Sequence, residues 1–148
     1  MYNTLLAILA SQFLNVPYKW SGNNYDGLDC SGFVLLSLSS VGVVLPDMTS
    51  QSIYHWAINN KSFQSCEPDE PDCLLFFGHS VNYIKHVSIG LGKYPGYEDR
   101  GPFMIEAGGS GRDSLHLSKE ELARRDARVR IKPVSNRSDL VASIKITY

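Results

Sequence analysis

A cysteine between an acid and a serine begins the part of the sequence best suited to chemistry. Cys30 lies in the segment LDCSGFVL, residues 28–35, and an apolar run follows it at once. This run predicts a helix from about Cys30 to Val41. A thiol at the N-terminal end of a helix faces unpaired backbone N–H groups and the positive end of the helix dipole, which favour a thiolate. The alternative is a small buried side chain that only packs the start of the helix.

A reactive thiolate needs a base, and the second half of the sequence offers one. His86 opens the segment HVSIGLG, which predicts a strand. Glu106 lies inside the next expected strand, in the segment FMIEAGG. A carboxylate buried in the middle of a strand is costly unless something pairs with it, and an imidazolium is a suitable partner. We therefore expect Glu106 within reach of His86 across a hairpin.

The elements that must position these side chains are helices in the first half of the chain and strands in the second. Beyond the helix at Cys30, apolar spacing predicts an N-terminal helix that ends before Pro17, and a cap at Thr49 or Ser50 predicts a third helix. Strands are expected at residues 73–77, 86–92, 102–107, 127–134 and 140–148, and Ser118 with Glu121 forms a capping box for a helix between the third and fourth of them.

This order of elements is the pattern of an α+β domain in which N-terminal helices pack on a central antiparallel sheet. In the segment at His86, Val87, Ile89 and Leu91 alternate with Ser88 and Gly90, so we expect one face of the strand to lie in the core. Neither a repeat nor a linker divides the chain, and we expect residues 1–148 to form a single domain.

The composition excludes several classes of function. The chain has 148 residues, 43% of them hydrophobic and 20% charged, and a net charge of −1. This balance gives no electrostatic reason to expect a nucleic acid or a membrane as partner. The basic segment ARRDARVRIK, residues 123–132, is interrupted by Asp126, and we interpret it as a solvated helix end that leads into a strand. The N-terminal LLAILA lacks preceding basic residues, so we interpret it as helix and expect no export signal.

The cysteines are too few for a disulfide scaffold. With three in the chain, at least one thiol is free. Cys66 and Cys73 flank the acidic segment CEPDEPDC and could pair in an oxidising compartment, but we expect two inert thiols. A zinc site from Cys73, His79 and His86 matches no usual ligand spacing, so we expect neither a metal nor another cofactor.

The segment PYKWSGNNYDGLDCSGFV resembles the hallmark of the NlpC-type family of bacterial and phage cell-wall cysteine peptidases, which are papain-like. That family typically has Pro-Tyr-x-Trp-Gly-Gly, a short loop, and then Asp-Cys-Ser-Gly-Phe or Asp-Cys-Ser-Gly-Leu. PDCLLFF is similar to the family's Gly-Asp-Leu-x-Phe-Phe strand and KHVSIGLG to its His-Val-Gly-Ile-Tyr-Leu-Gly strand, while FMIEAGG falls where the family has its third polar residue. The resemblance runs from about Leu5 to Gly109.

This resemblance implies a papain-like fold and a role for each matching residue. Cys30 would be the nucleophile and His86 the general base and later acid. Glu106 would orient His86 in the position usually held by His, Asn or Gln. The backbone N–H of Cys30 would be the main donor to the oxyanion.

Three further positions match residues that the family places around its substrate. Tyr18 matches a tyrosine whose hydroxyl lies by the nucleophile, where it can contact substrate or assist the oxyanion. Asp29 and Ser31 match the pair that helps receive the substrate's amine in members that cut near a free L-Ala terminus. Two departures accompany Glu106: Ser21 replaces the first glycine of Trp-Gly-Gly, and the insertion KYPGYEDRG, residues 93–101, could shape a substrate groove.

The resemblance implies a cysteine peptidase or amidase that cleaves the peptidoglycan stem peptide, by hypothesis at the bond between D-γ-Glu and the diamino acid. Since we expect no leader, we favour an enzyme delivered by a phage virion, which would have phage tail proteins as partners. The alternatives are an interbacterial toxin with an immunity protein, a module of the same fold that only binds muropeptide or a tail partner, and an acyltransferase.

Overall fold

The sheet of this protein is antiparallel throughout. The computed structural model describes residues 4–60 and 64–148, and in these residues six strands lie in the order β3-β8-β4-β5-β6-β7. Their bounds are Gln64–Ser65 for β3, Cys73–Ser80 for β4, Tyr83–Lys93 for β5, Pro102–Gly108 for β6, Arg128–Pro133 for β7 and Leu140–Lys145 for β8. The long β4–β5 and β5–β6 hairpins form its centre.

The helices begin at the capping residues that the sequence offers. They are α1 (Leu5–Ser11), α2 (Cys30–Ser40), α3 (Ser50–Asn59) and α4 (Lys119–Arg124), with the hairpin β1 (Asn23–Asn24) and β2 (Gly27–Leu28) before α2. Short 3₁₀ turns are η1 (Glu98–Arg100), η2 (Arg112–His116) and η3 (Val134–Asn136). The side chains of Thr49 and Ser118 cap α3 and α4, the latter in the expected capping box. None of the helices in the described residues is long and apolar enough to cross a bilayer.

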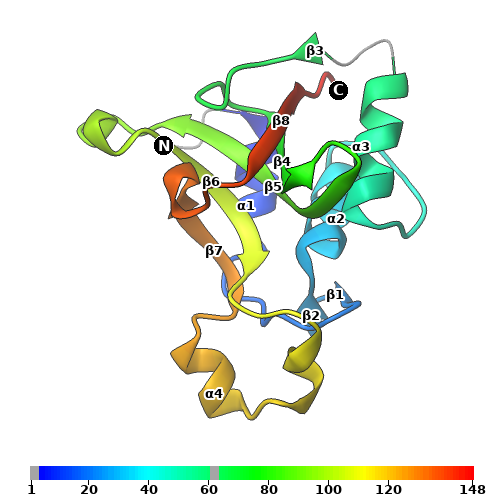
Figure 1. Ribbon diagram of the computed structural model, residues 1–148, viewed down its shortest axis with the longest axis vertical. Coiled ribbons are helices and arrows are strands. Elements are labelled where there is room, and N and C mark those ends of the chain that lie inside the picture. Colours follow the sequence, from blue (N-terminus) through cyan, green and yellow to red (C-terminus); the bar gives the residue numbers. More distant parts are fainter. Residues whose placement is uncertain (1–3, 61–63) are drawn as a thin grey trace.

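The helices and the sheet are arranged as the sequence predicts. Figure 1 shows α2 and α3 together on one side of the sheet, while the β6–β7 connection, which carries η2 and α4, extends toward β1 and β2. The predicted α+β fold with N-terminal helices on an antiparallel sheet is therefore confirmed. The first helix is shorter than expected, because the chain leaves it after Ser11 and turns through Asn15, whose φ is 73°.

Both faces of the central strands are buried, which corrects the expectation of a single core face. Val87 and Ile89 pack into the main core under the helices. Ser88 points the other way but is also fully buried, and its hydroxyl donates to the Met104 sulfur at 3.3 Å. A second apolar cluster, which includes Phe77 and Met104, covers that face.

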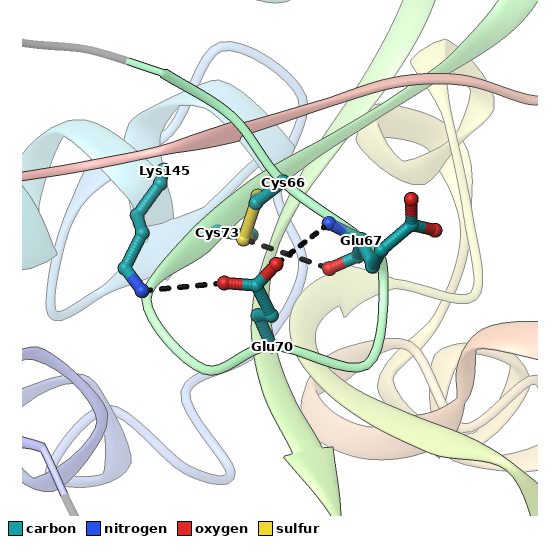
Figure 2. Close-up of a disulfide and its surroundings, with 5 residues drawn as sticks. All are labelled: Cys66, Glu67, Glu70, Cys73 and Lys145. Atoms are coloured by element: carbon teal, nitrogen blue, oxygen red, sulfur yellow. Dashed lines mark hydrogen bonds and ion pairs between the residues drawn. A yellow bond between two sulfur atoms is a disulfide. The ribbon is translucent and has the colours of Figure 1, made fainter.

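A disulfide joins Cys66 and Cys73 (Figure 2), so the expectation of two inert thiols is wrong. Cys66 follows β3 and Cys73 begins β4, and both of these strands pair with β8. The shared neighbour brings the two cysteines together. Cys30 is the free cysteine among the described residues.

Candidate active site

The start of α2 is held by the backbone of the preceding loop and by the side chain of its N-cap. Asp29 accepts hydrogen bonds from the N–H of Gly32 at 2.7 Å, the hydroxyl of Ser31 at 3.2 Å and the N–H of Ser21 at 3.1 Å. A Cβ on Gly32 would collide with the carbonyl oxygen of Gly22, so the helix needs glycine there to approach the loop. These contacts fix the first turn of the helix, on which Cys30 lies.

The imidazole of His86 links the thiol to the carboxylate. Its Nε2 lies 2.8 Å from Oε1 of Glu106, and Cys30 lines the same cleft as the ring, close enough for its negative charge to act on the pKa of the imidazole. The ring is 7% exposed. Burial by itself disfavours the imidazolium, but the hydrogen bonds and negative charges of Cys30 and Glu106 outweigh it and raise the pKa of His86 to about 9.

Glu106 is an ionised carboxylate inside the protein. It is 2% exposed, and burial by itself would raise its pKa. The hydrogen bond and charge of His86, together with the charge of Arg130, overcome this effect and hold the pKa of Glu106 below its ordinary value. Arg130 contacts Oε2 through both Nε and Nη2, each at 3.0 Å. The carboxylate thus lies between two cations, with one oxygen for each.

Cys30 and His86 open into a cleft of about 300 Å³. Tyr18, Asp29 and Ser31 line it too, so the structure brings all six predicted site residues, with Glu106 behind His86, into one region. Burial, followed by the negative charges of Cys30 and Asp29, raises the pKa of Tyr18 well above its ordinary value, so its hydroxyl keeps its proton and can donate. Burial also raises the pKa of Asp29, although its three hydrogen bonds act in the opposite direction.

A larger hollow of about 600 Å³ shares Tyr18 with this cleft but has other walls, which come mainly from the N-terminal loop, η2 and α4. The residues that line it include neither a cysteine nor a histidine. The smaller cleft is therefore the candidate active site, because it alone of the two combines a nucleophile with a base.

The insertion at residues 93–101 does not line the cleft, which corrects the expectation that it could shape the substrate groove. It connects the end of β5 to the start of β6, whereas His86 lies near the start of β5. Lys93 lies seven positions beyond His86 along the strand, a distance of roughly 23 Å at the usual rise per residue. His79 is exposed at the end of β4 and does not line the cleft either.

Two features of the site were not predicted from the sequence. Arg130 lies in the segment that we interpreted as solvated, yet its side chain is only 11% exposed and pairs with Glu106. The signal that could have found it is the buried acid itself, which requires compensation. Ser21, in place of a family glycine, has a φ of 60°, a left-handed conformation that glycine adopts without strain.

Known proteins resemble this chain in sequence and in fold. The model of the NlpC/P60 family matches residues 15–130. The chain is 32% identical over 83 residues to the gamma-D-glutamyl-L-lysine dipeptidyl-peptidase of Bacillus cereus (strain ATCC 10987 / NRS 248), a match that covers 54% of this chain but only 23% of that protein.

Solved structures share the fold at lower identity. The P60 domain of an antigen from M. avium subspecies paratuberculosis is 22% identical, with a TM-score of 0.64 over 97% of this chain and 93% of that one. The NlpC/p60 domain of the peptidoglycan hydrolase SagA is 20% identical, also with a TM-score of 0.64, over 95% of this chain and 96% of that one. At these identities, the two structures show that the fold is shared and nothing more.

Proposed function

Because the chain belongs to the NlpC/P60 family, whose members are typically peptidoglycan-hydrolysing cysteine peptidases, we propose that it hydrolyses a peptide bond in the peptidoglycan stem through Cys30, His86 and Glu106. One observation carries this proposal: Cys30, at the start of a helix, lines a cleft together with His86, whose imidazole is held by a buried carboxylate at 2.8 Å. This is the arrangement that activates a cysteine for acyl transfer.

The first half of the reaction forms a thioester. The Cys30 proton passes to His86, and the thiolate attacks the carbonyl carbon of the substrate. The N–H of Cys30, unpaired at the helix start, donates to the oxyanion. When the intermediate collapses, the C–N bond breaks and the imidazolium of His86 gives its proton to the leaving amine. Before the attack, Cys30 and Glu106 raise the pKa of His86 to about 9, so the ring carries this proton at neutral pH. Once the sulfur is bonded to carbon, the negative charge of Cys30 no longer holds the proton, and the ring can release it and later act as a base.

The second half of the reaction releases the acid. Water attacks the thioester carbonyl while His86 removes its proton, and the C–S bond breaks to return the thiolate. Glu106 contacts neither the substrate nor the sulfur in this scheme. It accepts a hydrogen bond from Nε2, which fixes the ring plane and stabilises the imidazolium.

We place the scissile bond between D-γ-Glu and the diamino acid. The Bacillus cereus relative is named a gamma-D-glutamyl-L-lysine dipeptidyl-peptidase, and this name supports the choice of a bond between γ-D-glutamyl and a diamino acid. Asp29 and Ser31 would receive the free amine of the stem peptide. Asp29 accepts three hydrogen bonds within the protein, which leaves one of the roughly four acceptor positions of a carboxylate for the substrate.

The compartment in which the enzyme acts can be proposed from its disulfide. A disulfide persists in an oxidising compartment, and peptidoglycan lies in one, so the Cys66–Cys73 bond supports action outside the cytoplasm. We propose residues 1–148 as one peptidase domain. Delivery by a phage, an immunity protein and an acyltransferase outcome stay predictions from the sequence.

The test is digestion of purified sacculi followed by mass spectrometry of the muropeptides. We expect the wild-type protein to release fragments cut after D-γ-Glu and the Cys30→Ala variant to release none. Cys30 is partly exposed and the substitution removes only the sulfur, so the variant should fold, which its circular dichroism spectrum checks. Equal product masses from both proteins would remove Cys30 from the chemistry, and intact sacculi with both would favour a binding module.

A further inference from the structure

The carboxylate of Glu106 has a second partner that the mechanism above does not use. Arg130 lies directly opposite Glu106 in the β6–β7 register, so the two side chains leave the sheet on the same face. Its Nε and Nη2 both lie 3.0 Å from Oε2, while Oε1 accepts from His86 at 2.8 Å. The guanidinium therefore occupies the oxygen that His86 does not.

Arg130 is itself fixed in place. Its Nη1 donates to the backbone carbonyl of Asp126 at 3.1 Å and lies 3.7 Å from that residue's carboxylate. The side chain is 11% exposed, so the contact with Glu106 is largely protected from the solvent screening that weakens surface ion pairs. Arg130 is thus a rigid, largely buried partner for the carboxylate.

Gly108 shows how tightly the pair is packed. A Cβ at this position would lie 2.7 Å from Oε2 of Glu106 and 3.2 Å from Nη2 of Arg130. Its backbone is not in the left-handed region, so space and not conformation accounts for the missing side chain. Any larger residue would push the carboxylate or the guanidinium out of position.

We propose that Arg130 is a positioning residue of this active site, which occupies one oxygen of Glu106 and compensates its charge so that the other oxygen serves His86 alone. The effect that we expect Arg130 to have on turnover rests on the proposed function. Without Arg130, a carboxylate that is 2% exposed would have only His86 to offset its negative charge. Its second oxygen would also be free to compete for the imidazole, and the ring would lose its fixed orientation.

The charge of Arg130 also acts on His86 through Glu106. Among the described residues, Cys30 on α2 and Asp139 before β8 act on the ring, and Asp29, Lys85 and Arg137 line the same cleft. Arg137 also stacks on the Phe77 ring that contacts the imidazole. None of these changes when Arg130 is replaced. Removal of the guanidinium takes a positive charge away from the imidazolium, so the pKa of His86 should rise above about 9.

The experiment compares Arg130→Met, Arg130→Lys and, as a control, Arg128→Met. Arg128 lies on the same strand and pairs with the same Asp126, but its side chain is 41% exposed and does not contact Glu106. For Arg130→Met we expect kcat/KM on muropeptides to fall roughly a hundredfold, the cost of a misplaced catalytic group. Arg130→Lys keeps the charge but not the two-pronged contact, so its turnover should fall less.

The second readout is the titration of the His86 ring, followed by NMR in the protein without substrate. The midpoint should move to higher pH in Arg130→Met and stay at the wild-type value in Arg130→Lys and Arg128→Met. A loss of fold alone would also lower turnover, but it would move this midpoint down toward 6.5, the ordinary pKa of histidine, and not up. An unchanged or lower midpoint in Arg130→Met, or an equal shift in Arg128→Met, would overturn the inference.

Gly108→Ala provides a test that removes no charged group and covers the case in which Arg130→Met does not fold. We expect Gly108→Ala alone to lower turnover. The double variant with Arg130→Lys should lose less activation free energy than the two single variants lose together, because both substitutions act on the carboxylate of Glu106. Additive losses would count against a shared cause. If the wild-type protein does not cleave muropeptides, the proposed function fails, while the His86 titration still decides the role of Arg130.

Discussion

Glu106 and Glu70 are both paired with cations, yet they lie in opposite kinds of surroundings. Glu106 is buried between His86 and Arg130 at the candidate active site. Glu70 lies in the disulfide loop, where Lys145 approaches its Oε2 at 3.3 Å with both side chains more than 40% exposed (Figure 2). The region around Glu106 is held together by buried charges. The loop around Glu70 is held together by a covalent bond, and its charges are solvated.

The difference shows what each kind of interaction is for. A buried charge is expensive, and the charge of Glu106 is compensated by His86 and Arg130, on the first of which it acts directly. Exposed ion pairs contribute little because water and salt screen them, so the loop at Glu70 relies on the Cys66–Cys73 bond to hold its shape. Changes in the first region should therefore alter chemistry, and changes in the second should alter stability alone.

The largest effect is expected within the buried region, and it ranks His86 above Glu106. His86→Ala removes the base and acid, so turnover on muropeptides should fall roughly a thousandfold or more. Glu106→Gln keeps an oxygen that can accept from Nε2, but it loses the charge and turns an NH2 group toward Arg130, so the loss should be smaller than in His86→Ala, roughly a hundredfold. Steady-state kinetics measures both. An equal or greater loss in Glu106→Gln would mean that the carboxylate does more than orient the ring.

The buried region should also respond to alkali, whereas the disulfide loop should not. The pKa of His86 rises from 6.5 to about 9 in the folded protein, so its stabilising contribution is complete below pH 6.5 and is lost as the pH rises to about 9. At Glu70, the N–H of Glu67 and then Lys145 lower the pKa of the carboxyl, so that contribution is lost in acid.

Urea unfolding of the wild-type protein and of His86→Gln between pH 6 and 10 measures this response. The difference in unfolding free energy between the two proteins should shrink as the pH passes from 6.5 to 9. Glu70→Gln provides the control, since its difference from the wild type should stay constant over that range. A constant difference for His86→Gln as well would show that the ring is not charged in the native state at neutral pH.

The parts of the molecule that could be predicted from the sequence depend on signals within a few residues. Thr49 and Ser118 each cap the helix that follows, because a cap is a contact across one turn. The pairing of His86 with Glu106 followed from a buried acid that needed a partner in the next strand.

What could not be predicted depends on register between distant strands. Arg128, Arg130 and Lys132 alternate along one strand and look alike in the sequence, but only Arg130 lies opposite Glu106. The Cys66–Cys73 bond likewise depends on the pairing of both β3 and β4 with β8, which no local pattern specifies. Long-range pairing therefore decides which of several equal candidates is used.

The smallest expected effects come from the disulfide loop and separate its covalent bond from its charges. Replacing both Cys66 and Cys73 with Ser opens a short covalent loop. The unfolded chain then gains conformational entropy, which should lower the free energy of unfolding by about 2.5 kcal/mol. Thermal unfolding should show this loss, and kcat/KM on muropeptides should not change, because neither residue lines the cleft.

Lys145→Met removes the ion pair with Glu70 but keeps the aliphatic stem on β8. It should leave both the melting temperature and turnover at the wild-type values. A fall in turnover with either variant would mean that this edge of the sheet is coupled to the active site, and the division between a chemical and a structural region would not hold.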